Sequence, residues 1–341
     1  MDNKLNSIID KALSRRTFLA GAGSVAAATV VAGCGGSNTV PYVPPTPVQF
    51  TDADILNFAL NLEYLEAQFY LYAATGSGLS AADTGGSGGG YTEGTVTLGN
   101  AAQVPDLTSQ QQDIINEIAY EEQEHVRFLR KALGSAAVPM PDIDLSFFGP
   151  LAAAAGVSGG TAFNPFSTFN YFLVGAFIFE DVGVTAYQGA APLISAAGVA
   201  SGYLTAAAGI LAVEAYHAAY IRTAITAGAI ASTANVPYLT AANQVAALRA
   251  MLTVGNSGAP GTSTQNTGAP DSSQSVETPL ALPTSLTSLS SIVACDPVHA
   301  LAFARDVNQV HHVVYGSPTV GVAKGGFFPN GTNSIFATTT A

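Results

Sequence analysis

Two short patterns alternate along four helical segments of this 341-residue chain. In the first pattern a tyrosine follows a glutamate after seven residues, and it occurs at Glu63–Tyr70 and Glu180–Tyr187. In the second pattern a histidine follows a glutamate after three residues, and it occurs at Glu122–His125 and Glu214–His217. The patterns come in the order first, second, first, second. This order indicates a duplicated pair of helices.

The spacings have a direct meaning on an α-helix. Three residues turn the helix through about 300°, so the glutamate and histidine of each pair share one face, a turn apart. Seven residues make nearly two turns, so each tyrosine lies on the face of its glutamate, about 10 Å along the axis. The two patterns therefore predict four helices that present chemistry-bearing side chains on one face each.

The boundaries of these helices are indicated by capping residues and glycines. Thr51 and Asp54 form a predicted capping box for the first helix, and Ser109 and Gln112 form one for the second. Gly134, Gly189 and Gly228 are the expected ends of the second, third and fourth helices. The expected segments are about Asp52–Ala74, Ser109–Leu133, Ser167–Gln188 and Tyr203–Ala227.

These segments favour an all-α fold, a four-helix bundle over residues 51–228. The link 135–166 is long enough to be the crossover that joins two helical hairpins. An insert at 75–107, with a run of glycines, is expected to be a loop. Residues 229–341 form a C-terminal extension, with a weak helix at about Thr240–Leu252, a Ser/Thr/Pro-rich tract at about 254–286 and a last helix at about Pro297–Tyr315.

The first 50 residues are expected to be an export signal followed by a tether. Arg15 and Arg16 precede Thr17-Phe18-Leu19 and an uncharged run, which resembles a twin-arginine export signal. The run ends in Val31-Ala32-Gly33-Cys34, which resembles a bacterial lipobox, so residues 1–34 are expected to be the signal and Cys34 the lipidated residue. An uncleaved membrane anchor is the alternative, although the run is shorter than the ~20 residues of a spanning helix. Residues 35–50, rich in proline, then form a tether to an exported, envelope-attached body.

Composition restricts the function classes. Hydrophobic residues make up 48% and charged residues 10%, which excludes a wholly disordered chain. The net charge is −12, and residues 34–341 hold 7 basic against 21 acidic side chains. Nothing supplies the basic stripe that phosphates require, so we expect no nucleic-acid partner.

The scarcity of cations bears on the glutamates. The first and third helices contain no Lys or Arg, so an inward-facing Glu63 or Glu180 has no cation on its own helix. A buried carboxylate must be protonated, paired or bound to metal. Four carboxylates balance two divalent ions, and two neutral imidazoles complete a nitrogen and oxygen ligand set suited to iron or, as the alternative, manganese. The predicted ligands are Glu63, Glu122, His125, Glu180, Glu214 and His217.

The leading hypothesis gives each ligand an expected role. Glu122 and Glu214 are expected to bridge the two ions and Glu63 and Glu180 to be terminal ligands, with Tyr70 and Tyr187 as partners behind them. Glu66 lies near the face of Glu63, but Gly183 stands at its place in the second repeat, so Glu63 is preferred. The other polar residues considered are Glu121 and Glu124, expected on the solvated side; Arg130 and Arg222, expected near the surface or paired with a carboxylate; and His299, His311 and His312, for which no second metal site is expected.

Six segments resemble a bacterial ferritin-like-domain family that includes desiccation-related proteins. They are NFALNLEYLEA at 57–67, EQEHV at 122–126, EDVGVTAY at 180–187, VEAYH at 213–217, VVYG at 313–316 and GFFPNG at 326–331. The resemblance implies a ferritin-like four-helix bundle with a di-iron or related metal pair. The insert at 75–107 and the Ser/Thr/Pro-rich tract depart from the family's pattern.

The leading functional hypothesis is an envelope-attached di-metal protein that uses O2 or peroxide, either to oxidise Fe(II) or to remove peroxide, in stress protection. A non-enzymatic desiccation or stress scaffold with a structural metal, or none, is the alternative. Iron storage is a third interpretation, which the tether disfavours because a hollow shell needs many soluble subunits.

Overall fold

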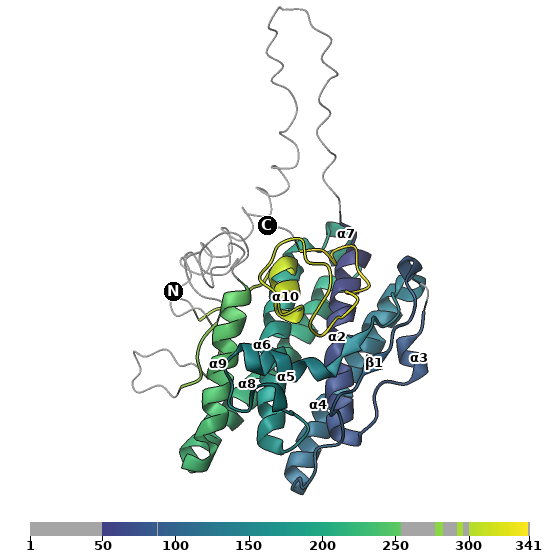
Figure 1. Ribbon diagram of the computed structural model, residues 1–341. Helices are drawn as coiled ribbons and strands as arrows, with labels where there is room; N and C mark the ends of the chain where they lie inside the picture. Colours follow the sequence, from purple (N-terminus) through teal and green to yellow (C-terminus); the bar gives the residue numbers. More distant parts are fainter. Residues whose placement is uncertain (1–49, 87, 254–276, 282–291, 296–299, 340–341) are drawn as a thin grey trace, which may run out of the picture. The chain divides into compact units, whose positions relative to one another are not determined.

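A computed structural model of the chain describes residues 50–86, 88–253, 277–281, 292–295 and 300–339 (Figure 1). The predicted signal with Cys34, the tether up to residue 49, most of the Ser/Thr/Pro-rich tract and His299 lie outside the described residues.

Four long helices form the body of the protein, as the sequence predicts. They are α2 (Asp52–Thr75), α4 (Ser109–Leu133), α6 (Phe169–Ala190) and α8 (Tyr203–Ala231). Helix α2 packs along α4, and α6 packs along α8, so each sequence repeat is one helical hairpin. Helices α2 and α6 also contact each other, which joins the two hairpins into one mostly helical bundle (Figure 1).

Shorter elements surround the bundle. The helices are α3 (Ala81–Thr84), α5 (Phe148–Ala154), α7 (Ala196–Ala200), α9 (Val236–Leu252) and α10 (Val307–Val314), and the strands are β1 (Val96–Thr97) and β2 (Ile143–Asp144). Strand β1 pairs in parallel with β2, with Val96 opposite Ile143. The insert at 75–107 is therefore more than the loop that its glycines indicate, because its second half is held against the crossover.

The start of each hairpin is fixed by a capping box. Thr51 caps α2 together with Asp54, as predicted. The cap of α4 is Thr108 with Gln111, one residue before the predicted pair, because Thr108 still has extended backbone while Ser109 is already helical. Gly134 ends α4 as expected.

Other helix ends differ from the prediction. Helix α6 continues through Gly189 to Ala190, and α8 continues through Gly228 to Ala231 before Ser232 takes up extended backbone. A glycine inside a helix costs about 1 kcal/mol relative to alanine, which packing in a long bundle helix offsets. The last helix is shorter than predicted, because Asp306 caps α10 and residues 300–306 are not helical.

The core lies around α2 and α6, which are buried along most of their length. An aromatic cluster surrounds Phe69, and its other rings are Phe148, Phe166, Phe172, Phe179 and Phe327. Phe327 comes from the C-terminal chain, and Asn333 of the same segment exchanges two hydrogen bonds with Asn61 of α2. Helix α10 and the chain after it thus cover part of α2 and α6.

Helices α6 and α8 are long and apolar enough to cross a membrane by length and composition alone. Helix α6 is mostly buried inside the bundle, and both helices turn a glutamate into its interior. A buried bundle helix accounts for the composition of α6, since it is apolar on all sides.

Candidate metal centre

The six predicted ligands meet inside the bundle. Helices α2 and α6 contribute one glutamate each, and α4 and α8 contribute a glutamate and a histidine each. None of the four glutamates is more than 1% exposed, and the two histidines are 4% and 8% exposed. The carboxylate and imidazole atoms fall into two overlapping groups in which all candidate donor atoms lie within 4.8 Å of one another.

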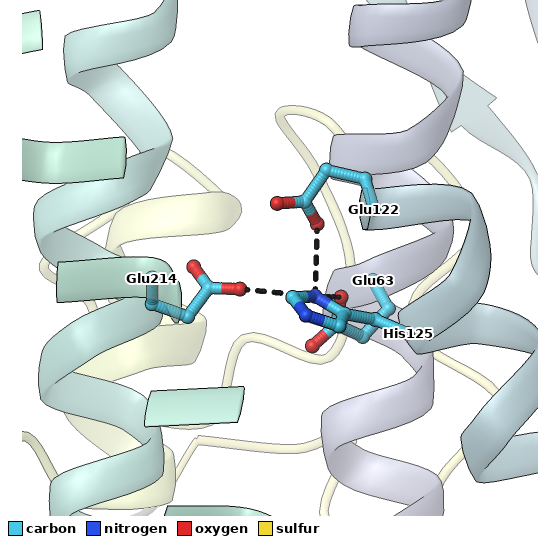
Figure 2. Close-up of side chains that lie close together, drawn as sticks. All are labelled: Glu63, Glu122, His125 and Glu214. Atoms are coloured by element: carbon cyan, nitrogen blue, oxygen red, sulfur yellow. Dashed lines mark hydrogen bonds and ion pairs between the residues drawn. The ribbon is translucent and has the colours of Figure 1, made fainter. Parts of the chain in front are cut away.

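The first group surrounds His125, which has three glutamates as neighbours (Figure 2). Its Nδ1 atom lies 3.2 Å from Oε2 of Glu63, 3.4 Å from Oε1 of Glu214 and 3.6 Å from Oε2 of Glu122. The side chains point toward one another from three helices (Figure 2).

The second group surrounds His217. Its Nδ1 atom lies 3.0 Å from Oε1 of Glu122 and 3.5 Å from Oε2 of Glu180. Glu122 belongs to both groups and turns one oxygen to each histidine. Its predicted role as a bridge stays a prediction. Glu214, the second predicted bridge, is grouped only with His125.

Several of these buried atoms lie close to one another but make no hydrogen bond of suitable geometry among the described residues. They are Oε1 and Oε2 of Glu122, Oε2 of Glu180, Oε1 and Oε2 of Glu214, and Nδ1 of His217. Buried carboxylate oxygens without donors are costly, and metal coordination satisfies them. The donor set is all oxygen and imidazole nitrogen, which is suited to iron or manganese. The residues therefore fit a pair of divalent ions.

Each tyrosine of the repeat supports the glutamate of the other repeat. Tyr70 on α2 donates a hydrogen bond to Oε1 of Glu180 on α6, and Tyr187 on α6 donates one to Oε1 of Glu63 on α2. Seven residues forward on α2 correspond to seven residues backward on α6, which is the register of two antiparallel helices. The predicted partner role of both tyrosines therefore has a geometric basis.

The electrostatics show how the cluster behaves without metal. Burial raises the pKa of Glu63 to about 7, and burial with the surrounding carboxylates raises the pKa of Glu214 well above its usual range. Although burial opposes it, contacts with His125 and His217 hold the pKa of Glu122 well below its usual range. Burial works against a charged His217, yet Glu180 and Glu122 raise its pKa to about 12. Without metal the cluster holds protons, which metal ions must displace.

A further buried carboxyl group, that of Glu66, lies beside the six predicted ligands. Glu66 is 5% exposed, and burial together with the charges of the cluster raises its pKa well above the usual range. It faces Gly183, where an added Cβ would lie 2.3 Å from Oε2 of Glu214 and 3.4 Å from Oε1 of Glu66. The repeat argues against Glu66 as a ligand. It does not reveal that Gly183, which has no side chain, leaves room for the carboxyl groups of Glu66 and Glu214. The three-residue spacing from Glu63 is the sequence signal for its burial.

The expectation for Glu121 is wrong in part. Its side chain is 35% exposed, so it reaches solvent, but its Oε2 lies 2.6 Å from Nε2 of His217 on the facing helix. The helical pattern of α4 places Glu121 off the face of Glu122, and the contact depends on how α8 packs against α4. Glu124 is solvated as expected, where it pairs with Arg127.

A cleft of about 310 Å³ leads from the surface to the outer edge of this centre. It lies between α4 and α8, and its walls are Ile114, Glu117, Ile118, Glu121, Val213, Tyr216, His217 and Tyr220. His217 therefore has one ring nitrogen on the cleft side, facing Glu121, and the other on the side of the buried carboxylates.

Behind Glu180, a buried network of charges holds the extension to the bundle. Arg222 and Arg249 donate to Oδ2 of Asp181 at 2.7 and 2.8 Å, and Arg249 also pairs with Glu277. Arg305 pairs with the same Glu277. Arg222 is buried and paired with Asp181, so the second of its two expected alternatives, pairing with a carboxylate, is confirmed.

The remaining predicted residues lie apart from the cluster. Arg130 donates to the hydroxyl of Tyr64 and to the carbonyl of Gly85, both at 2.5 Å. His311 and His312 are buried on α10, where they contact Thr332 and the carbonyl of Ser317.

A fold of two antiparallel helical hairpins, with a glutamate from each of two helices and Glu-x-x-His from the other two, is the arrangement of ferritin-like carboxylate proteins. The family model for the ferritin-like domain matches residues 51–227. The chain belongs to this ferritin-like domain family.

Two proteins with assigned names are similar to this chain in sequence. The "Ferritin-like catalase Nec2" of Nesocodon mauritianus is 27% identical over 295 residues, which are 85% of this chain and 86% of the relative. The "Desiccation-related protein PCC13-62" of Craterostigma plantagineum is 33% identical over 173 residues, which are 50% of this chain and 52% of the relative. The resemblance to ferritin-like and desiccation-related proteins is thus confirmed.

Proposed function

We propose that this chain is a di-metal protein that removes hydrogen peroxide. The carrying observation is the set of buried carboxylate and imidazole atoms that face one another without hydrogen-bond partners. The relative whose name describes a ferritin-like catalase matches most of the chain, which favours peroxide removal over the oxidation of Fe(II).

The proposed reaction converts two molecules of hydrogen peroxide into two of water and one of O2. One peroxide gives up two electrons and two protons, and the other takes them up, so no outside reductant is required. A bound metal pair supplies the two-electron relay and Lewis acidity that this exchange needs. Iron and manganese both suit the donor set, with iron our first expectation.

The protein residues would hold and shield the pair. Glu63, His125 and Glu214 would hold one ion, and Glu180 and His217 would hold the other. Glu122, which belongs to both groups, would contact both ions. Tyr187 and Tyr70 hold the terminal glutamates in place through their hydroxyl groups. The buried surroundings keep bulk water from the centre, which strengthens every electrostatic contact inside it.

The test uses the full chain, loaded with Mn²⁺ or Fe²⁺ without oxygen, and follows O2 release from hydrogen peroxide. Glu122→Gln should lower both metal content and O2 release, the latter about 100-fold or more. Glu124→Gln is the matched control, because Glu124 lies on the same helix but pairs with Arg127 at the surface. A loaded wild-type protein that releases no O2, or a fully active Glu122→Gln variant, would overturn the proposal.

A non-enzymatic stress scaffold is the second candidate, favoured by the likeness to a protein named as desiccation-related. Metal removal separates the two. If stripped protein stays folded and peroxide removal vanishes, then returns on reloading, the scaffold interpretation fails. If no metal ever gives turnover but protein with bound metal is more stable, the enzyme interpretation fails.

We further propose that the chain is exported and tethered to the bacterial envelope through Cys34. The support is the paired arginines, the apolar run and the small residues before Cys34 in the sequence. Labelling with a radioactive fatty acid should mark the wild-type protein and not Cys34→Ala. Equal labelling of both, or of neither, would reject the lipid anchor.

A further inference from the structure

The two halves of the centre differ at one position of the repeat. The residue before Glu122 is Glu121, whereas the residue before Glu214 is Val213. Each of them lies four residues before the histidine of its own helix. A carboxylate four residues before the histidine is therefore present in the first repeat, as Glu121, and replaced by Val213 in the second.

Glu121 serves the histidine of the other helix. Its Oε2 lies 2.6 Å from Nε2 of His217, while Nδ1 of the same ring faces Glu122 at 3.0 Å and Glu180 at 3.5 Å. A neutral imidazole carries one proton. When Nε2 carries that proton and donates a hydrogen bond to Glu121, the lone pair of Nδ1 points at the buried carboxylates. This tautomer is the one whose Nδ1 can bind a metal ion.

Among the residues that the structure describes, His125 has no corresponding support. The antiparallel register that sets Glu121 against His217 assigns Val213 the equivalent place against His125. Within the described ranges no carboxylate forms an ion pair with Nε2 of His125, and its Nδ1 is the atom that faces Glu63, Glu122 and Glu214. The tautomer and orientation of His125 are therefore less constrained at Nε2 than those of His217.

We propose that the two metal positions are unequal and that Glu121 makes the position at His217 bind a divalent ion first and more tightly. This inference depends on the proposed function only in requiring that the centre binds metal. A hydrogen-bonded carboxylate behind a ligating histidine changes metal affinity by about 10–100-fold. Glu121 acts through His217 and is a positioning residue.

The cleft between α4 and α8 gives the metal position at His217 a direct route from solvent, separate from the affinity that Glu121 sets. Glu121 and Glu117 both line it, one turn apart on α4, and His217 lies at its inner side. A cation that enters from solvent by this route meets two carboxylates and then His217. Along this path, a cation passes Glu117, Glu121 and His217 before it reaches the metal position at His125.

The experiment titrates metal-free full-length protein with Mn²⁺, without oxygen, by calorimetry. Wild type should bind two ions in two steps whose dissociation constants differ about 10–100-fold. Glu121→Val, which gives the first repeat the residue of the second, should weaken the tighter step by this factor and merge the two. Glu121→Gln keeps an oxygen that accepts from Nε2 of His217 and should restore two separate steps.

Two further variants keep the test decisive. Glu117→Val removes the same charge from the same cleft without touching His217, so it should leave both steps in place. Val213→Glu should strengthen the weaker step, and it stands as the test if Glu121→Val does not fold. Circular dichroism checks the fold of each.

Three results would contradict the inference. They are two equal steps in wild type, an equal effect of Glu117→Val and Glu121→Val, or no rescue by Glu121→Gln. Wild type that binds no ion at all would instead remove the proposed function, and with it this inference, so the two failures are distinguishable.

Discussion

The hydroxyl of Tyr187 donates a hydrogen bond to Oε1 of Glu63, across the interface between α6 and α2. Tyr70 makes the reciprocal contact with Glu180, so the two hairpins are locked together through the residues that surround the centre. The same contacts fix the direction of two terminal carboxylates. The same two tyrosines therefore contribute both to the contact between the hairpins and to the placement of the ligands.

Removing one of these hydroxyl groups should weaken metal binding. Tyr187→Phe leaves the ring in the core but takes the donor from Glu63, so the affinity for Mn²⁺ should fall about tenfold or more. Tyr216→Phe is the control, because Tyr216 is 75% exposed. Calorimetric titration measures both, and an unchanged affinity in Tyr187→Phe would show that Glu63 needs no such support.

The metal-free protein should lose stability as pH rises from about 4.5 to 7. The folded-state pKa of Glu63 is raised to about 7 from an ordinary 4.5. The stabilisation of the fold by protonated Glu63 is therefore complete below pH 4.5 and is lost as the pH rises through 7. The expected slope from this group is about 1.4 kcal/mol per pH unit. Urea unfolding of wild type and Glu63→Gln, both metal-free, measures it, and parallel pH curves for the two would contradict the assignment.

Filling the space at Gly183 should disturb the centre while the bundle stays folded. An added Cβ would lie 2.3 Å from Oε2 of Glu214, the far end of a flexible side chain, which must turn away. Gly183→Ala should therefore lower metal affinity about tenfold or more. Gly209→Ala is the matched control, since a Cβ there meets nothing within 4 Å, and it should raise stability by about 0.5–1 kcal/mol. Equal metal content in both variants would refute the role of Gly183.

Breaking the buried charge network should destabilise the fold. Asp181 accepts hydrogen bonds from Arg222 and Arg249, both 1% exposed. Asp181→Asn leaves these buried guanidinium groups short of a negative charge, at a cost of about 3–5 kcal/mol in the free energy of unfolding. Asp113→Asn, at an exposed position of α4, should change it by less than about 0.5 kcal/mol. Denaturant unfolding compares the two, and similar midpoints would show that the network adds little.

The sequence predicts the long helices well because their signals are local. Helix α4 spans the predicted residues, and α2 extends one residue further than predicted. The six clustered residues follow from spacing on one helix face combined with the repeat. The ends of α6 and α8 were less predictable, since packing in the bundle carries both helices past Gly189 and Gly228.

Contacts between distant segments are the part that the local pattern does not contain. The pairing of β1 with β2 joins residues 47 apart, as in Val96 with Ile143, and glycines alone indicate a loop there. The contact of Glu121 with His217 depends on which face α8 turns to α4. The cross-bonding of Tyr70 and Tyr187 likewise requires the antiparallel register of two helices that are far apart in the sequence.

The central claim is that a metal pair sits among the buried glutamates and histidines. Anomalous scattering from crystals of anaerobically loaded protein, at the iron and manganese edges, tests it most directly. We predict two peaks, one at Glu63 and His125 and one at Glu180 and His217, with Glu122 between them. An ordered cluster without a peak in crystals grown with an excess of Fe²⁺ or Mn²⁺ would contradict the account.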